Sequence, residues 1–104
     1  MANLKEQIEK DIKENKVIIY MKGTPDSPQC GFSAQVVNIL KSYNIPLSTR
    51  NVLPDPQLRQ AIKDFTDWPT IPQIFINGEF VGGCDILNEM HQKGELKKLL
   101  EGIK

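Results

Sequence analysis

The chain has 104 residues, 39% of them hydrophobic and 25% charged, a composition typical of a folded globular protein. This length suits one domain with its own core, and we expect a single domain over residues 1–104. Thirteen basic residues balance thirteen acidic ones, which argues against nucleic acid or a membrane surface as the main partner. No apolar run approaches the ~20 residues of a membrane-spanning helix.

The first sixteen residues mix acids with lysines and contain no apolar stretch. Secretory signals need such a stretch and transit peptides avoid acids, so this segment matches neither. Two cysteines are fewer than a small disulfide-stapled secreted domain carries, which favours a reducing compartment. We expect a cytoplasmic location in a bacterium, or the mitochondrial matrix if a leader has been removed.

The first elements follow from hydrophobic spacing. Leu4, Ile8 and Ile12 recur at four-residue steps, which predicts a helix with one apolar stripe. "VIIYM", residues 17–21, is a short apolar run rich in β-branched residues and predicts a buried strand. "KGTPDSP" after it, residues 22–28, has the glycine and prolines of a loop.

The middle of the chain predicts a helix, a strand and a second helix. The apolar face of the first helix, after Cys30, comprises Val36, Val37, Leu40 and Tyr43. "LSTRNV", residues 47–52, predicts the strand. Asp55 is a suitable N-cap for the next helix and Pro56 a suitable first residue.

The last third predicts a hairpin and two helices. Asn77-Gly78 is the preferred pair for a type I′ turn and is flanked by strand formers. One helix is expected to start near Cys84 and stop at Gly94, and the other to extend to Ile103. This element order predicts an α/β fold with a four-stranded mixed sheet flanked by helices.

Cys30 stands where a loop turns into a helix. Unpaired N–H groups at a helix N-terminus favour the thiolate, the reactive and metal-binding form of cysteine. Lys22, at the end of the preceding strand, is expected near the same site, and Gly31 leaves the sulfur accessible. The competing interpretation is a buried structural cysteine.

Ser33 occupies the position of the second cysteine in a C-x-x-C pair. Cys30 therefore cannot close a disulfide with it and must act through an outside cysteine, glutathione or a metal. One histidine and two cysteines cannot complete a four-ligand metal site unless carboxylates or outside ligands help.

Three motifs, "KGTPDSPQCGFS", "WPTIPQ" and "GGCDI", resemble in order and spacing the monothiol glutaredoxins of CGFS type, in their short single-domain form. The resemblance covers essentially the whole chain. It implies a thioredoxin-like fold and a 2Fe–2S cluster bound by Cys30 with glutathione as co-ligand. Four sulfur ligands would come from two Cys30 thiolates and two glutathiones, so the cluster would be shared in a homodimer. A cluster held in this way should be labile, which suits a carrier that delivers it to iron–sulfur apoproteins.

The resemblance also suggests where glutathione lies. Lys22 and Arg59 are candidates for its glycine-end carboxylate, although helical periodicity alone leaves Arg59 equally suited to a solvated surface. Pro72 favours an extended backbone at Ile71, whose free edge would pair with the glutathione peptide. Family members have the bond before this proline in the cis form. The alternative for Pro72 is an ordinary proline at the start of a strand.

"GGCDI" supplies a helix N-terminus for the γ-glutamyl end of glutathione. The N–H groups of Cys84 and Asp85 would bind its carboxylate and the Asp85 side chain its amino group, while Gly83 allows close approach. Asp85 alternatively caps the helix. Cys84 is expected to be a packed residue rather than a disulfide partner of Cys30.

Three further side chains have weaker roles. Trp68 is expected to pack in the core or at the rim rather than stack on a ligand. Phe32 is expected to be exposed beside the thiol, and His91 to be solvated near a helix end.

Two further functions remain open beside the carrier. One is a weak glutathione-dependent oxidoreductase that removes glutathione from protein mixed disulfides through Cys30. The other is an interaction module, because the family's partners include BolA-like proteins that replace one subunit of the homodimer.

Overall fold

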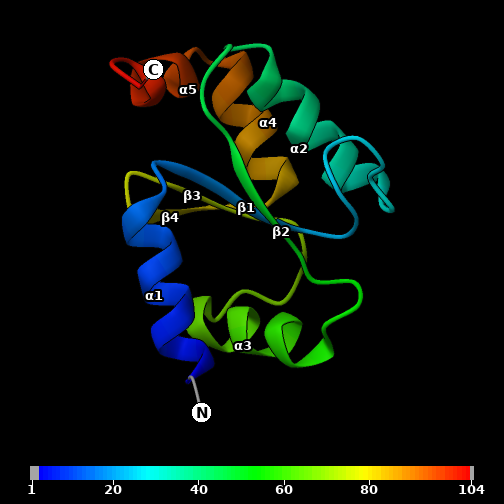
Figure 1. Cartoon of the computed structure of the whole chain (residues 1–104). Coiled ribbons are helices and arrows are strands. Elements are labelled where there is room, and N and C mark those ends of the chain that lie inside the picture. Colours follow the sequence, from blue (N-terminus) through cyan, green and yellow to red (C-terminus); the bar gives the residue numbers. More distant parts are fainter. Residues whose placement is uncertain (1–2, 104) are drawn as a thin grey trace.

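A computed structural model describes residues 3–103 as a central sheet covered by helices on both faces (Figure 1). The elements are α1 (Leu4–Glu14), β1 (Val17–Met21), α2 (Gly31–Lys41), β2 (Ser48–Asn51), α3 (Pro56–Thr66), β3 (Gln73–Ile76), β4 (Glu79–Gly82), α4 (Cys84–Gln92) and α5 (Glu95–Leu100). The strand order is β2-β1-β3-β4, with β1 parallel to β2 and antiparallel to β3. The predicted four-stranded mixed sheet is confirmed.

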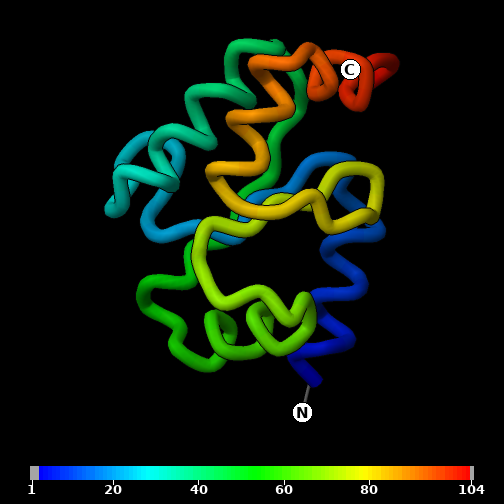
Figure 2. The backbone as a smooth tube through the Cα atoms, turned by 180° about the vertical axis from the view of Figure 1, so that it is seen from behind, coloured from blue at the N-terminus to red at the C-terminus, as the bar shows by residue number. Residues whose placement is uncertain are grey.

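The central strand β1 is apolar throughout because both of its faces are buried. Val17, Ile19 and Met21 join a core cluster with α2, α4 and α5, whereas Ile18 and Tyr20 join a second cluster with α1 and α3. Figure 2, seen from behind, shows these two helical layers on opposite sides of the sheet. Burying an isoleucine side chain fully contributes roughly 1.5–3 kcal/mol, so β1 anchors both layers.

Short sequence motifs predicted the start of α3 and the turn between β3 and β4 correctly. Asp55 caps α3 by accepting a hydrogen bond from the Leu58 N–H at 3.1 Å, and Pro56 is the first helical residue. Asn77 and Gly78 have φ of 54° and 81°, as a type I′ turn requires. The prediction for the last helix was too long.

Helix α5 ends at Leu100 instead of reaching Ile103. Gly102 has a φ of 84°, outside the helical region, and turns the chain after the helix. Ile103 nevertheless packs into the cluster on the α4 side with 8% exposure. Ile103 therefore matches the apolar spacing of the helix because its side chain is buried, not because it belongs to the helix.

The loop before Cys30 is tied down at both ends. The Gln29 N–H donates to the Lys22 carbonyl at 3.0 Å, and Gly23 pairs with Pro28 in an isolated bridge. At the end of β2, the Asn51 side-chain oxygen accepts from the Gly23 N–H at 2.9 Å. The loop is thus fixed against the ends of β1 and β2. Within residues 3–103, no helix has the length and apolarity needed to cross a membrane.

Candidate functional site

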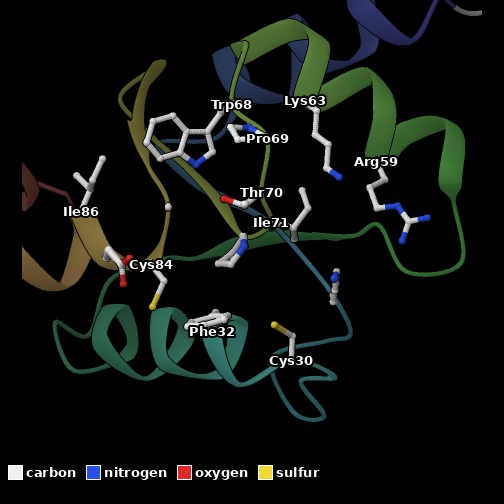
Figure 3. A pocket seen from close by; sticks show the side chains of 14 residues that line it. Cys30, Phe32, Arg59, Lys63, Trp68, Pro69, Thr70, Ile71, Cys84 and Ile86 are labelled. Atoms are coloured by element: carbon white, nitrogen blue, oxygen red, sulfur yellow. The ribbon is translucent and has the colours of Figure 1, made fainter.

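An open pocket of about 490 Å³ lies where the end of β1 and the starts of α2 and α4 meet α3 and the loop before β3 (Figure 3). All eight site residues predicted from the sequence line it: Lys22, Cys30, Arg59, Ile71, Pro72, Gly83, Cys84 and Asp85. They come from segments spread over more than half of the chain. The fold therefore gathers the predicted residues around one space.

Cys30 is the N-cap residue of α2 and is partly exposed. The Ser33 backbone N–H, in the first turn of α2, is the main cause that lowers the pKa of the Cys30 thiol below its ordinary value. The Phe32 N–H, the Ser33 hydroxyl and the Lys22 charge lower this pKa further, and partial burial opposes them. Cys30 is therefore an accessible cysteine with an increased fraction of thiolate.

Ser33 has a structural role that the sequence analysis missed. Its side chain is fully buried, and its hydroxyl oxygen accepts a hydrogen bond from the Lys22 N–H at 3.2 Å. This bond joins the end of β1 to the first turn of α2. The available signal was spacing, because Ser33 lies on the same helical face as buried Val36, Val37 and Leu40.

Three cations line one side of the pocket. Lys22 follows β1, and Arg59 and Lys63 project from α3 towards the space that Cys30 faces (Figure 3). Arg59, for which periodicity left two options, thus lines the pocket. Lys63 was missed, although it lies four residues after Arg59 and so on the same helical face.

The start of α4 and the loop before β3 form another side of the pocket. The Ile71–Pro72 bond is cis, as the resemblance implied. A Cβ at Gly83 would lie 3.2 Å from the Trp68 Nε1 and 3.3 Å from the Pro72 carbonyl oxygen, so the loop packs closely there. The N-cap of α4 is Gly83, with no side-chain cap bond, and Asp85 lies in the first turn. The alternative interpretation, in which Asp85 caps this helix, is therefore wrong.

Cys84 is a packed thiol with its own hydrogen bond. It is 8% exposed, and its sulfur donates to the Gln35 side-chain oxygen at 3.2 Å. Burial, the Asp85 charge and Cys30 raise the pKa of the Cys84 thiol. Both cysteines are free. This agrees with the expected packed role of Cys84.

The sequence predicted the exposure of Phe32 and the packing of Trp68 correctly, but it missed a contact of His91. Phe32 is 60% exposed beside Cys30, as expected. Trp68 packs edge-on against Phe80, with ring centroids 5.7 Å apart, and also lines the pocket. His91 is exposed but is more than a solvated helix end, because its Nδ1 lies 2.6 Å from the Tyr43 hydroxyl.

The donor set of the pocket is limited. Among residues 3–103 no group of three or more histidine, cysteine, aspartate or glutamate side chains could hold a metal ion. The pocket instead offers one accessible low-pKa thiol, three cations, and the first-turn N–H groups of α4 beside Asp85. This arrangement offers partners for carboxylates and for an amino group next to a reactive thiol.

Comparison with known proteins gives the family. The glutaredoxin family model matches residues 17–81. A monothiol glutaredoxin of Synechocystis is 53% identical over 97 residues, which cover 93% of this chain and 91% of that protein. This chain belongs to the monothiol glutaredoxins.

This monothiol glutaredoxin has relatives from plants as well. Mitochondrial monothiol glutaredoxin-S15 of Arabidopsis thaliana is 54% identical over 101 residues, which cover 97% of the chain but 60% of the plant protein. The chain thus spans less than two thirds of that relative's length. The solution structure of reduced poplar apo GrxS14 matches with a TM-score of 0.83 and 50% identity, covering 94% of this chain and 90% of GrxS14. The predicted thioredoxin-like fold is confirmed.

Proposed function

We propose that this monothiol glutaredoxin carries a 2Fe–2S cluster, held by Cys30 and glutathione between two chains, and delivers it to apoproteins. The observation that carries the proposal is the single accessible low-pKa thiol in a cation-lined pocket. Cys84 is buried, its pKa is raised, and its sulfur is bonded to Gln35, which leaves Cys30 as the available ligand.

The number of sulfur ligands supports a shared cluster. A 2Fe–2S cluster takes four thiolate-type ligands, and each chain supplies one through Cys30. Two chains and two glutathione thiolates complete the set. Because two of these ligands are exchangeable small molecules, the cluster is cargo that can be passed on. A BolA-like protein is proposed to take the place of one subunit.

The pocket suits glutathione at each end of the molecule. Lys22 and Arg59 provide cations for the glycine-end carboxylate, and the first turn of α4 provides N–H donors for the γ-glutamyl carboxylate. Asp85, in that same turn, can take the amino group. Ile71 contributes a backbone edge between the two ends. Because this chemistry needs reduced thiols, we propose a reducing compartment, either the cytoplasm or the mitochondrial matrix.

Anaerobic reconstitution with iron, sulfide and glutathione tests the carrier. Visible spectroscopy and size-exclusion chromatography are applied to wild type, Cys30→Ser and Cys84→Ser, each with and without glutathione. We expect a coloured dimer that requires Cys30 and glutathione but forms in Cys84→Ser. Loss of colour in Cys84→Ser, or a cluster formed without glutathione, would contradict the proposed ligand set.

The low pKa of Cys30 also favours a second candidate, a glutathione-dependent oxidoreductase. The Cys30 thiolate would attack the glutathione sulfur of a protein mixed disulfide and release the protein thiol. A second glutathione would then attack the Cys30 mixed disulfide, which yields glutathione disulfide and reduced Cys30. If wild type forms no cluster but reduces glutathionylated protein rapidly, this function replaces the carrier.

A further inference from the structure

Gln73, the last residue of "WPTIPQ" and the first of β3, has a fully buried side chain and does not line the pocket. Its Nε2 donates to the carbonyl oxygens of Trp68 at 3.0 Å and Thr70 at 3.2 Å. Its Oε1 accepts from the Thr66 hydroxyl at 2.8 Å. The whole amide is therefore used to hold the loop between α3 and β3.

The orientation of this amide is fixed by its partners. Turning it over would bring the Gln73 oxygen against two carbonyl oxygens, so Nε2 must face the loop. The Thr66 hydroxyl lies 2.8 Å from Oε1 and 3.0 Å from the Ile62 carbonyl oxygen, which compete for its single proton, and Oε1 is the nearer acceptor. The hydroxyl oxygen also accepts from the Trp68 N–H at 3.2 Å. A carboxylate of the same size would offer no donors to the two carbonyls.

The bond to Thr70 has a consequence for the next residue. In a trans peptide the C=O and the following N–H point in opposite directions, and within residues 3–103 the only cis bond is Ile71–Pro72. Because the Thr70 carbonyl points inward to Gln73, the Ile71 N–H points the other way, where Thr70 and Ile71 line the pocket. This N–H makes no backbone hydrogen bond within the described residues.

The same loop faces the start of α4. A Cβ at Gly83 would be tightly packed, because the Trp68 Nε1 and the Pro72 carbonyl oxygen lie 3.2 and 3.3 Å from where it would be. Gln73 holds the Trp68 carbonyl on the interior side of this loop. The amide thus also influences the separation between the Ile71 backbone and the N-terminus of α4.

We infer that Gln73 is a positioning residue, which aims the Ile71 N–H into the pocket as a donor for a peptide carbonyl of glutathione. The inference rests on the proposed glutathione site and adds a residue that does not touch the ligand. Thr66 acts with Gln73 by holding its oxygen. A donor that is already oriented in the free protein raises the affinity for glutathione, because the loop then loses less conformational entropy when the ligand binds.

The test is a titration of reduced glutathione into the full apo chain, followed by NMR of the Ile71 amide. Gln73→Glu keeps the size of the side chain but replaces both donors, and Thr66→Val removes only the hydroxyl. We expect Gln73→Glu to raise the glutathione Kd about tenfold and Thr66→Val about threefold, since about 1.4 kcal/mol corresponds to tenfold. The Ile71 amide signal should shift in both variants before glutathione is added.

Two controls separate positioning from general destabilisation. Gln60→Glu changes an exposed glutamine on α3 in the same way. Leu96→Ala lowers stability by emptying a fully buried position on α5, in the core cluster that does not include Ile71. Neither should change the glutathione Kd by more than about twofold, because neither residue lines the pocket. Cys30 alkylation without glutathione should stay the same in all four variants.

The outcomes distinguish the two proposals. If wild type binds glutathione and Gln73→Glu binds it equally well, the positioning role is wrong and the glutathione site stands. The positioning role is also wrong if Leu96→Ala weakens binding as much as Gln73→Glu. If wild type itself binds no glutathione, the glutathione site fails and this inference fails with it.

Discussion

At the scale of single residues, the state of the Cys30 thiol depends on donors from its own helix. The Ser33 N–H is the main cause of the lowered pKa, and the Ser33 hydroxyl adds to it while also accepting from the Lys22 N–H. The serine in place of a second cysteine therefore does more than remove an internal disulfide. It supports the thiolate and ties its helix to the sheet.

Alkylation of Cys30 by iodoacetamide as a function of pH measures this effect. Because the pKa is lowered, the rate should reach its half-maximum below the ~8.5 of a free cysteine. Ser33→Ala keeps the backbone donor but loses the hydroxyl, so the half-point should move up and the rate at neutral pH fall about fivefold. Cys84, with its raised pKa and burial, should react much more slowly.

Ser42→Ala is the matched control, because Ser42 caps the far end of α2 and bonds the Ile39 carbonyl. It should leave the Cys30 profile unchanged. An identical profile in Ser33→Ala and wild type would show that the hydroxyl has no influence on the thiol.

At the scale of elements, the loop between β1 and α2 depends on one glycine. Gly23 has a φ of 91°, and a Cβ there would lie 2.6 Å from both the Gln29 nitrogen and the Ser27 carbonyl oxygen. Gly31, at the start of α2, has nothing within 4 Å of a Cβ. Two glycines close to the same cysteine therefore have opposite tolerance.

Urea unfolding of two alanine variants tests this contrast. Gly23→Ala should lower the free energy of unfolding by about 2 kcal/mol or more, because it combines a left-handed backbone with a backbone clash. Gly31→Ala should be neutral or raise it by up to about 1 kcal/mol, since alanine favours a helix. Equal effects of the two substitutions would contradict the loop geometry.

The cap of α3 matters because this helix carries Arg59 and Lys63 to the pocket. The Asp55 side chain accepts a hydrogen bond from the Leu58 N–H. Asp55→Ala removes this bond and should lower the free energy of unfolding by about 1 kcal/mol. Asp55→Asn keeps an acceptor oxygen and should cost much less. Thermal unfolding of both variants gives the comparison, and similar losses would show that the cap bond contributes nothing.

At the scale of the whole molecule, the sheet holds two core clusters together, and a buried tyrosine links the second cluster to charged groups. Tyr20 is fully buried beside Asp11, which forms an ion pair with Arg50 at 3.1 Å between α1 and β2. Burial is the main cause that raises the pKa of Tyr20 above its usual range, and the Asp11 charge adds to it. Its hydroxyl has no hydrogen-bond partner within residues 3–103.

The raised pKa predicts how stability depends on alkaline pH. In the unfolded chain Tyr20 loses its proton near pH 10, whereas in the folded chain it keeps it. The unfolded state is therefore favoured as pH rises above about 10, and stability falls there. Tyr20→Phe should unfold like wild type at pH 8 but lose less free energy between pH 9 and 11. Parallel curves for the two proteins would rule out Tyr20 as the cause.

The sequence by itself determined the order of the elements, the type I′ turn, the cap at Asp55 and the candidate thiol. These features depend on neighbours within a few residues, such as apolar spacing, glycine and proline, or a cap beside a helix start. The family motifs added the pocket residues. The end of α5 was misjudged because burial of Ile103 gives the same apolar spacing as a helix.

Only the tertiary structure decided which polar side chains serve the site from inside. Ser33 bonds to Lys22 eleven residues away, Cys84 bonds to Gln35 across 49 residues, and the Gln73 amide closes on its own preceding loop. In the sequence nothing distinguishes Lys63 from an ordinary surface lysine, and only the position of α3 in the fold shows that Lys63 lines the pocket. For Ser33, Cys84 and Lys63 the physical reason is that the contacts arise from packing of elements that are separated in the chain. For Gln73 the partners are near in the chain, but they meet its amide only once the loop has folded back on the start of β3. In neither case does local propensity encode the direction in which the side chain points.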